Sequence, residues 1–149
     1  YNVADFIEEC LKSVYDQEHK HLEVICVNNN STDETISRIK TLKETSYPDL
    51  LLLEETKKGA NAARNCGLKH ATGEWIQFLD ADDLLLPKKI SSQLTIIKRS
   101  SFSGFISARA TRIKVNGEKF TYELQDEDPY LAAFIGKAGT TCSNLWGKE

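Results

Sequence analysis

The chain has 149 residues, of which 40% are hydrophobic and 28% are charged, and its formal net charge is -3. This length and balance predict one soluble domain with its own core. A nucleic-acid binder is disfavoured, because such proteins neutralise phosphates with clustered lysine and arginine, and the chain has no basic excess. No apolar run approaches the length of a membrane span or resembles a signal peptide.

The first part of the chain predicts a helix, a strand and a second helix. Apolar residues at helical spacing predict a helix over Ala4 to Tyr15. The predominantly apolar run Leu22 to Val27 predicts a buried strand. A second helix is expected from Ser31 through Leu42, with Ser31 or Thr32 as its cap and Glu34 placed as in a capping box.

The alternation continues after this helix. The expected elements are a strand at Leu50 to Leu53, a loop and helix over Gly59 to Lys69, a strand at Trp75 to Leu79 and a helix over Pro87 to Arg99. They are followed by strand-like alternation over Phe105 to Tyr122 with a turn at Asn116-Gly117, and by a helical stretch around Tyr130 to Ile135. This order indicates βαβ units, so we expect a mostly parallel, twisted sheet covered by helices, with a C-terminal β-hairpin.

The four cysteines show no CxxC spacing; they are Cys10, Cys26, Cys66 and Cys142. Cys26 lies in an apolar run, and Cys10 lies on the apolar side of a helical pattern. We therefore expect reduced thiols, most of them in the core, and a cytoplasmic location.

An acidic cluster, Asp80-Ala81-Asp82-Asp83, directly follows the strand expected at Trp75 to Leu79. Carboxylates crowded at the end of a buried strand repel one another, so folding alone gives no reason to place them there. A divalent cation such as Mg²⁺ or Mn²⁺ would remove the repulsion, and it shares its oxygen ligands with phosphates. The alternative is a solvated acidic turn that opens a helix. Asn28-Asn29-Asn30-Ser31 follows another strand, and ligands bind beyond such strand ends, which favours the functional interpretation.

Two segments resemble the motifs of family 2 glycosyltransferases, which have the GT-A fold. They are VNNNSTDET (Val27 to Thr35) and KKGANAARNCGLKHATGEWIQFLDADDLLLP (Lys57 to Pro87). The usual family forms are VDDGSTD, GxxxARNxG and ATGEYIxFLDxDD followed by proline, and their order and spacing match from Tyr1 to about Pro87. The resemblance implies a Rossmann-like sheet with helices on both faces. It also implies sugar transfer from a nucleotide sugar, with a UDP-sugar expected, to a saccharide or lipid-linked acceptor in polysaccharide or cell-surface glycan synthesis.

The resemblance also implies roles for five residues. Asp82 would bind a Mn²⁺ or Mg²⁺ ion that bridges the diphosphate, and Asp80 would face the ribose or assist at the metal. Arg64 matches an arginine near the nucleotide, with a salt bridge inside the site as its alternative role. Tyr1 would stack on the base. Asn29 stands where the family has an aspartate that accepts the uracil N–H, and its carbonyl can accept the same bond.

The chain departs from the family pattern in two respects. Asn28 and Asn29 replace paired aspartates. Both ends of the domain are expected to lie outside the chain, with the family's first strand before Tyr1 and the catalytic base of an inverting transfer after Glu149. Residues 1–149 are thus expected to be one GT-A domain, incomplete at both ends, and the catalytic base stays unassigned.

Two other functions stay open. A non-catalytic nucleotide-sugar-binding module would explain the asparagine pair and the missing base. A sugar-phosphate nucleotidyltransferase has a related fold and metal-binding acids, but it usually carries a Gly-rich phosphate loop near its start, and none is visible in this sequence. We expect no nucleic-acid partner, and peripheral association with the inner face of a membrane stays open.

Overall fold

The structure is a computed structural model that describes residues 1–100, 105–106, 108, 110–114, 116–122 and 145–147. Its helices are α1 (Ile7–Tyr15), α2 (Thr35–Thr45), α3 (Ala60–His70) and α4 (Lys89–Ser100). Its strands are β1 (Ile25–Asn28), β2 (Leu51–Glu54), β3 (Trp75–Gln77), β4 (Phe105–Ile106), β5 (Ala110–Ile113), β6 (Lys119–Tyr122) and β7 (Leu145–Gly147). The expected helical stretch at residues 130–135 lies outside the described residues.

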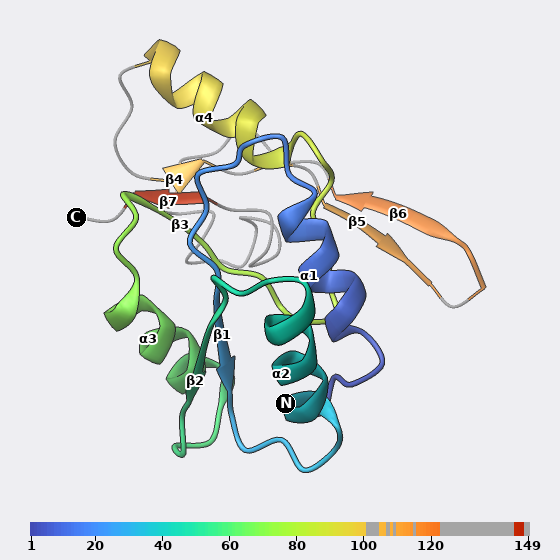
Figure 1. Cartoon of the computed structure of the whole chain (residues 1–149). Helices are drawn as coiled ribbons and strands as arrows, with labels where there is room; N and C mark the ends of the chain where they lie inside the picture. Colours follow the sequence, from blue (N-terminus) through green and yellow to red (C-terminus); the bar gives the residue numbers. More distant parts are fainter. Residues whose placement is uncertain (101–104, 107, 109, 115, 123–144, 148–149) are drawn as a thin grey trace.

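The described strands form three groups (Figure 1). β1 and β2 pair in parallel, with Ile25 opposite Leu51. β7 lies between β3 and β4 and pairs antiparallel with both. β5 and β6 form the predicted hairpin, in which the Gly117 amide donates to the Lys114 carbonyl at 2.8 Å. The predicted α/β fold is confirmed, and β1–β2 is the parallel pair among the described strands.

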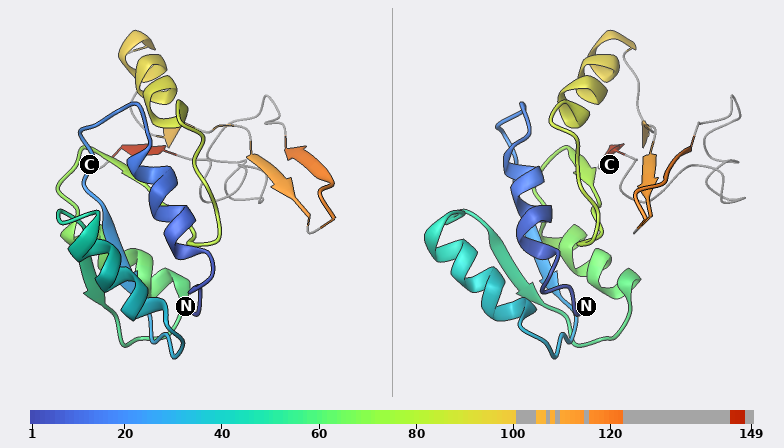
Figure 2. Two further views of the ribbon diagram at one scale, coloured as in Figure 1. Left: turned by 45° about the vertical axis from the view of Figure 1, so that its right-hand side comes forward. Right: turned by 90° about the vertical axis from the view of Figure 1, so that its right-hand side faces the viewer.

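Helices cover both faces of the β1–β2 pair, as expected (Figure 2). α2 lies on one face, α3 packs against β1 on the other, and α1 packs beside α2. The apolar stripe of α1 turns toward these neighbours, which buries Ile7 and Leu11. Together with Ile39 and Leu50 they form a core cluster. Burial of this apolar surface is the main force that holds the N-terminal half together.

The predicted capping box of α2 is wrong. The helix begins at Thr35, and Glu34 occupies the N-cap position without a side-chain hydrogen bond. Ser31 and Thr32 instead bond to Asn2. The backbone amide of Asn2 donates to the Ser31 hydroxyl at 3.2 Å, and the backbone amide of Thr32 donates to Asn2 Oδ1 at 2.9 Å. The two residues expected at the helix cap therefore hold the N-terminal segment, Ser31 through its hydroxyl and Thr32 through its backbone amide.

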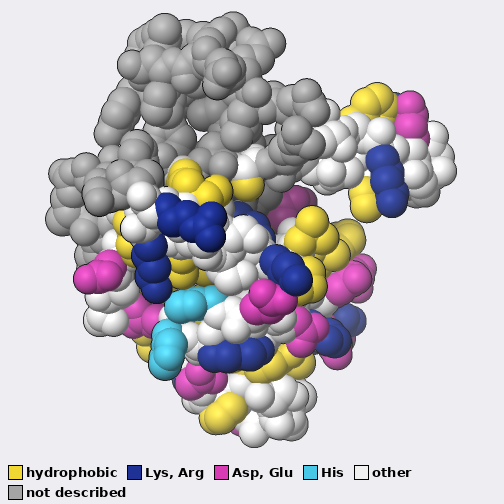
Figure 3. All heavy atoms as spheres, turned by 90° about the horizontal axis from the view of Figure 1, so that it is seen from above, with side chains coloured by type: hydrophobic (Ala, Val, Ile, Leu, Met, Phe, Trp, Pro, Cys, Tyr) yellow, Lys and Arg dark blue, Asp and Glu magenta, His cyan; other side chains and the backbone are white. Residues whose placement is uncertain are grey.

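The described cysteines, Cys10, Cys26 and Cys66, are free thiols, as expected. In the described part of the chain, none of the helices combines the length and the apolar character that crossing a bilayer requires. On the face shown in Figure 3, basic and acidic side chains of the described residues are interspersed.

Candidate functional site

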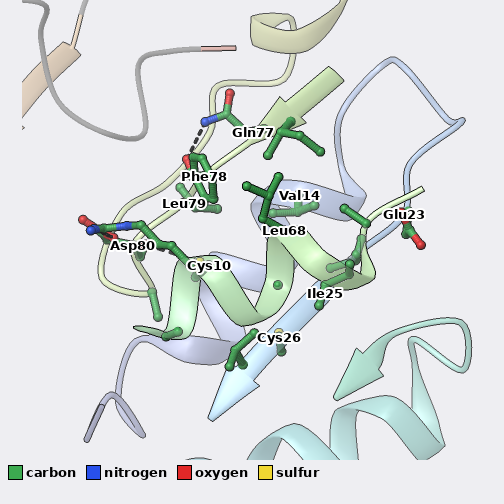
Figure 4. Close-up of a pocket in the computed structure, with 18 of the residues that line it drawn as sticks. Cys10, Val14, Glu23, Ile25, Cys26, Leu68, Gln77, Phe78, Leu79 and Asp80 are labelled. Carbon is green, nitrogen blue, oxygen red and sulfur yellow. Dashed lines mark hydrogen bonds and ion pairs between the residues drawn. The ribbon is translucent and has the colours of Figure 1, made fainter. Parts of the chain in front are cut away.

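The five predicted site residues line one cavity of about 1230 Å³. It extends between α1, α3, β1 and β3, and Figure 4 shows Cys10, Cys26 and Leu68 along its middle, with Asp80 at one end. The strands β1 and β3 explain this placement, because Asn28 ends β1 and Asp80 follows shortly after β3. The structure therefore brings together residues that the sequence only predicted to share a sheet edge; they are Tyr1, Asn29, Arg64, Asp80 and Asp82.

Arg64 and Asp80 form an ion pair across the cavity wall. Arg64 Nη2 donates to Asp80 Oδ1 at 2.7 Å, and Nη1 donates to Asn61 Oδ1 at 3.3 Å. The arginine lies one turn into α3, and its bonds to Asn61 and Asp80 set where its guanidinium points. The two side chains are 28% and 46% exposed, so solvent or a ligand reaches both. The salt bridge given as Arg64's alternative role is thus present, and it leaves the guanidinium accessible.

The acidic loop is held from one side by α1. The Cys10 thiol contacts the Asp80 carbonyl oxygen at 3.9 Å, and the Ser13 hydroxyl accepts the Leu85 amide at 3.1 Å. Further along, Gln17 Nε2 donates to the Leu86 carbonyl at 2.8 Å. These contacts fix both ends of the segment that carries Asp82. A loop whose ends are held in this way keeps its backbone in place without a ligand.

Sequence reasoning missed Ser13 and Gln17. Gln17 is fully buried, with 0% of its surface exposed. The sequence did contain a signal for the burial of Gln17, because this residue stands seven positions after Cys10 and so continues the apolar side of α1. A polar residue at such a position needs a buried hydrogen-bond partner. Gln17 bonds to the Ser13 carbonyl oxygen of α1 and to two partners after the acidic loop, Leu86 and Ile90.

The carboxylates of Asp80, Asp82 and Asp83 bring negative charge to this end of the cavity. Burial, together with the smaller effects of the nearby Cys26, Asp83, Asp82 and Asp80, raises the pKa of the Cys10 thiol to about 12. A negative potential favours any cation that approaches the loop. Asp82 is exposed and Asp80 is half-buried, so their carboxylates are open to such an ion.

The donor set fits a cation that shares its ligands with phosphate. Among the described residues, no three side chains of Asp, Glu, His and Cys gather as a metal-binding group. A hard cation such as Mg²⁺ does not require one, since it is bound by one or two carboxylates together with phosphates and water. Asp82 and Asp80 lie on the wall of the cavity and would supply those carboxylates.

The N-terminal segment is fixed by the start of α2. The Val3 amide donates to Thr35 Oγ1 at 2.9 Å, and the Ala4 amide donates to Asp33 Oδ2 at 3.2 Å. The Thr35 hydroxyl also donates to Asp33 at 2.6 Å, which lowers the pKa of that carboxyl group. Tyr1, at the end of this segment, is 70% exposed at the cavity, so its ring is open to a stacking partner.

Asn29 makes three hydrogen bonds to the loop between β2 and α3. Its Nδ2 donates to the carbonyl oxygens of Glu55 and Lys57, both at 2.8 Å. Its Oδ1 accepts the Gly59 amide, also at 2.8 Å. Asn28 differs, since its Oδ1 accepts the Ser31 amide at 3.2 Å. That Asn29 accepts a base N–H stays a prediction.

The chain was compared with known proteins. The family model described as "Glycosyl transferase family 2" matches residues 1–144. The chain is 38% identical over 94 residues to the Escherichia coli UDP-Glc:alpha-D-GlcNAc-diphosphoundecaprenol beta-1,3-glucosyltransferase WfaP, which covers 63% of this chain and 37% of WfaP. It is 33% identical over 129 residues to an uncharacterized glycosyltransferase of Haemophilus influenzae, which covers 87% of this chain and 42% of that protein.

The fold was compared with solved structures. A crystal structure of S. aureus TarS in complex with UDP matches with a TM-score of 0.69 and 26% identity, over 85% of this chain and 37% of that chain. The chain thus spans less than half the length of each of these three proteins. The family match extends through the site described above, including both motifs and the acidic loop. The chain therefore belongs to glycosyl transferase family 2, and its α/β fold is the GT-A fold.

Proposed function

We propose that the protein transfers a sugar from a UDP-sugar to a saccharide or lipid-linked acceptor, with Mg²⁺ or Mn²⁺ at the donor diphosphate. The observation that carries this proposal is the Arg64–Asp80 pair beside the exposed Asp82, on the wall of one cavity in a family 2 chain. The TarS complex with UDP and the UDP-Glc in the name of WfaP support the choice of donor.

In this proposal the residues bind and orient the donor. Asp82, assisted by Asp80, holds the cation, which supplies Lewis-acid stabilisation of the diphosphate as it leaves. Arg64 offers guanidinium N–H groups to phosphate oxygens, for which its planar geometry is suited. Tyr1 places its ring against the base. Arg64 and Asp80 are already paired before the donor arrives, which lowers the entropic cost of assembling the site.

The remaining parts of the proposal rest on the comparisons and the family resemblance. The name of WfaP specifies an acceptor on diphosphoundecaprenol, and this supports a lipid-linked acceptor in cell-surface glycan synthesis. A lipid-linked acceptor would bring a cytoplasmic protein to the membrane surface, so we include peripheral membrane association. Inversion at the anomeric carbon rests on the family resemblance. We assign no catalytic base among the described residues.

Calorimetric titration of UDP and GDP, each with and without Mn²⁺, tests the donor site. We expect Mn²⁺-dependent binding of UDP in preference to GDP, and its loss in Asp82→Ala. Glu118→Gln is a matched control for the loss of one negative charge, because Glu118 pairs with Lys114 on the β5–β6 hairpin. The proposal is wrong if Asp82→Ala binds UDP as the unmodified protein does, or if GDP is preferred.

A further inference from the structure

Loop 55–59, which joins β2 to α3, depends on asparagine side chains for its backbone hydrogen bonds. The Glu55 carbonyl oxygen accepts from Asn29 at 2.8 Å and from Asn30 at 3.2 Å. Thr56 O accepts from Asn30 at 3.1 Å, and Lys57 O accepts from Asn29 at 2.8 Å. The loop has neither helical nor strand structure of its own, so these side chains satisfy carbonyl groups that a regular element would otherwise pair.

An aspartate in place of Asn29 could not make the same contacts. The Asn29 NH₂ group supplies both donors to the loop, whereas a carboxylate is an acceptor only. The carboxylate would keep the bond from the Gly59 amide but would place negative charge against two carbonyl oxygens. Asn29 is only 8% exposed, so water would screen this repulsion poorly.

The loop determines where α3 begins. Gly59, whose amide bonds to Asn29, precedes the helix at a φ of 123°, a conformation that side chains disfavour. The Gly59 carbonyl oxygen then accepts the Ala62 amide at 3.0 Å in the first turn. Arg64 follows in the next turn and reaches Asp80. A chain of contacts therefore leads from Asn29 through the start of α3 to the guanidinium.

We propose that Asn29 is a positioning residue, which acts on the donor diphosphate through loop 55–59 and Arg64 and not through the base. This inference rests on the proposed function for its link to the donor. It replaces the contact to the base that the resemblance implied for Asn29, because the side-chain amide already bonds to loop 55–59. It also gives a physical reason for asparagine at this position, which the family pattern does not.

The test compares Asn29→Asp with the unmodified protein, using UDP and inorganic pyrophosphate as probes with Mn²⁺ in calorimetry. Pyrophosphate carries no base, so it reports on the diphosphate end of the site alone. We expect both affinities to fall by the same factor, on the order of tenfold, as for the loss of a charge-assisted hydrogen bond. A base contact predicts instead that UDP binding alone changes.

Amide hydrogen exchange tests the loop independently of any ligand. The Glu55 amide bonds to the Asn28 carbonyl oxygen at 2.9 Å, and the Ala62 amide bonds to Gly59, so these two amides report on both ends of the loop. We expect faster exchange at both in Asn29→Asp. Asn28→Asp is the matched control for exchange, because Asn28 uses its oxygen and an aspartate keeps that acceptor.

A second control separates positioning from a general loss of stability. Ile39→Val removes one methylene from the core cluster and should lower stability without changing pyrophosphate affinity. If Asn29→Asp fails to fold, Asn30→Gly replaces it. Asn30 has a φ of 62°, which glycine adopts without strain, so this variant removes only the bonds to Glu55 and Thr56. It should lower both affinities equally, by a smaller factor.

Several results would overturn the inference. One is a fall in UDP affinity without a fall in pyrophosphate affinity, which would place Asn29 at the base. Another is unchanged exchange at Glu55 and Ala62 in Asn29→Asp. A third is faster exchange with both affinities unchanged. If the unmodified protein binds neither probe, the proposed function fails and the link to the donor fails with it, while the exchange result still decides whether Asn29 holds the loop.

Discussion

Gln17, just after the end of α1, donates a hydrogen bond of 2.8 Å to the carbonyl oxygen of Leu86, which lies 69 positions further along the chain. The same side chain accepts the Ile90 amide at 3.2 Å, at the start of α4. One buried amide thus joins α1 to the segment that leaves the acidic loop. The position of Asp82 therefore depends on a residue that is not one of the predicted cation ligands.

Replacing Gln17 by methionine should destabilise the protein by about 1–3 kcal/mol. Methionine has a similar size, but it offers the Ile90 amide no comparable acceptor and leaves a buried donor without its bond. Urea denaturation followed by circular dichroism measures the change. Ser91→Ala, next to Ile90 at a solvent-exposed contact, is the control and should change stability by less than about 0.5 kcal/mol. A change in Gln17→Met no larger than in this control would show that the bond contributes little.

Arg64→Ala should weaken Mn²⁺-dependent UDP binding by about tenfold or more. Its effect on the free energy of unfolding should stay below about 1 kcal/mol, because partly exposed ion pairs contribute little to stability. The UDP affinity of Arg64→Lys should lie between those of the unmodified protein and Arg64→Ala, since lysine keeps the charge but not the planar donor geometry. Calorimetry and urea denaturation measure the two effects. Unchanged affinity combined with a large loss of stability would mean that the pair is structural only.

Thr35→Val should release the N-terminal segment from α2. Thr35 is buried, and its hydroxyl oxygen accepts the Val3 amide at 2.9 Å. The substitution leaves that amide unpaired and should cost about 1–3 kcal/mol. We expect faster hydrogen exchange of the Val3 amide and a lower urea midpoint. Thr41→Val is the control, because the Thr41 hydroxyl bonds only to the Ser37 carbonyl oxygen on the exposed side of the same helix. Equal exchange of Val3 in both variants would contradict this role.

The pH dependence of stability should carry a contribution from Cys26. Although the residue is only partly buried as a whole, burial of its thiol raises its pKa from 9.0 to about 11. The unfolded chain loses this proton above pH 9 and the folded chain does not, so stability falls as pH rises from about 9 to about 11. The slope contributed by one thiol approaches about 1.4 kcal/mol per pH unit.

Unfolding curves of the unmodified protein and of Cys26→Ala, recorded between pH 8 and roughly pH 11, measure this contribution. The alanine variant should lose less stability over this range than the unmodified protein, whatever the difference in stability between the two at pH 8. The difference in slope isolates Cys26 from the other groups that titrate there, such as Tyr15, whose pKa is raised mainly by burial. Two parallel curves would show that the folded and unfolded thiols titrate alike.

The sequence predicted the element types well because their signals are local. The apolar spacing along α1 and the run before β2 each depend on neighbours within one element. The start of α2 was misplaced because Ser31 and Thr32 bond to Asn2 and not to the helix. The partner of β3 was not predictable either, since β7 follows it by many residues, and a hydrophobic pattern shows which face of a strand is buried but not which distant strand pairs with it.

The sequence alone determined the alternation of helices and strands, the motifs typical of the family and the placement of acids directly after a buried strand. These features depend on residue order, which the sequence contains in full. Only the tertiary structure decided that Arg64 reaches Asp80 across 16 positions, and that Asn29 bonds to Gly59 across 30. A side chain's hydrogen-bond partner is set by which distant segments pack beside it, and that packing is a property of the folded chain as a whole.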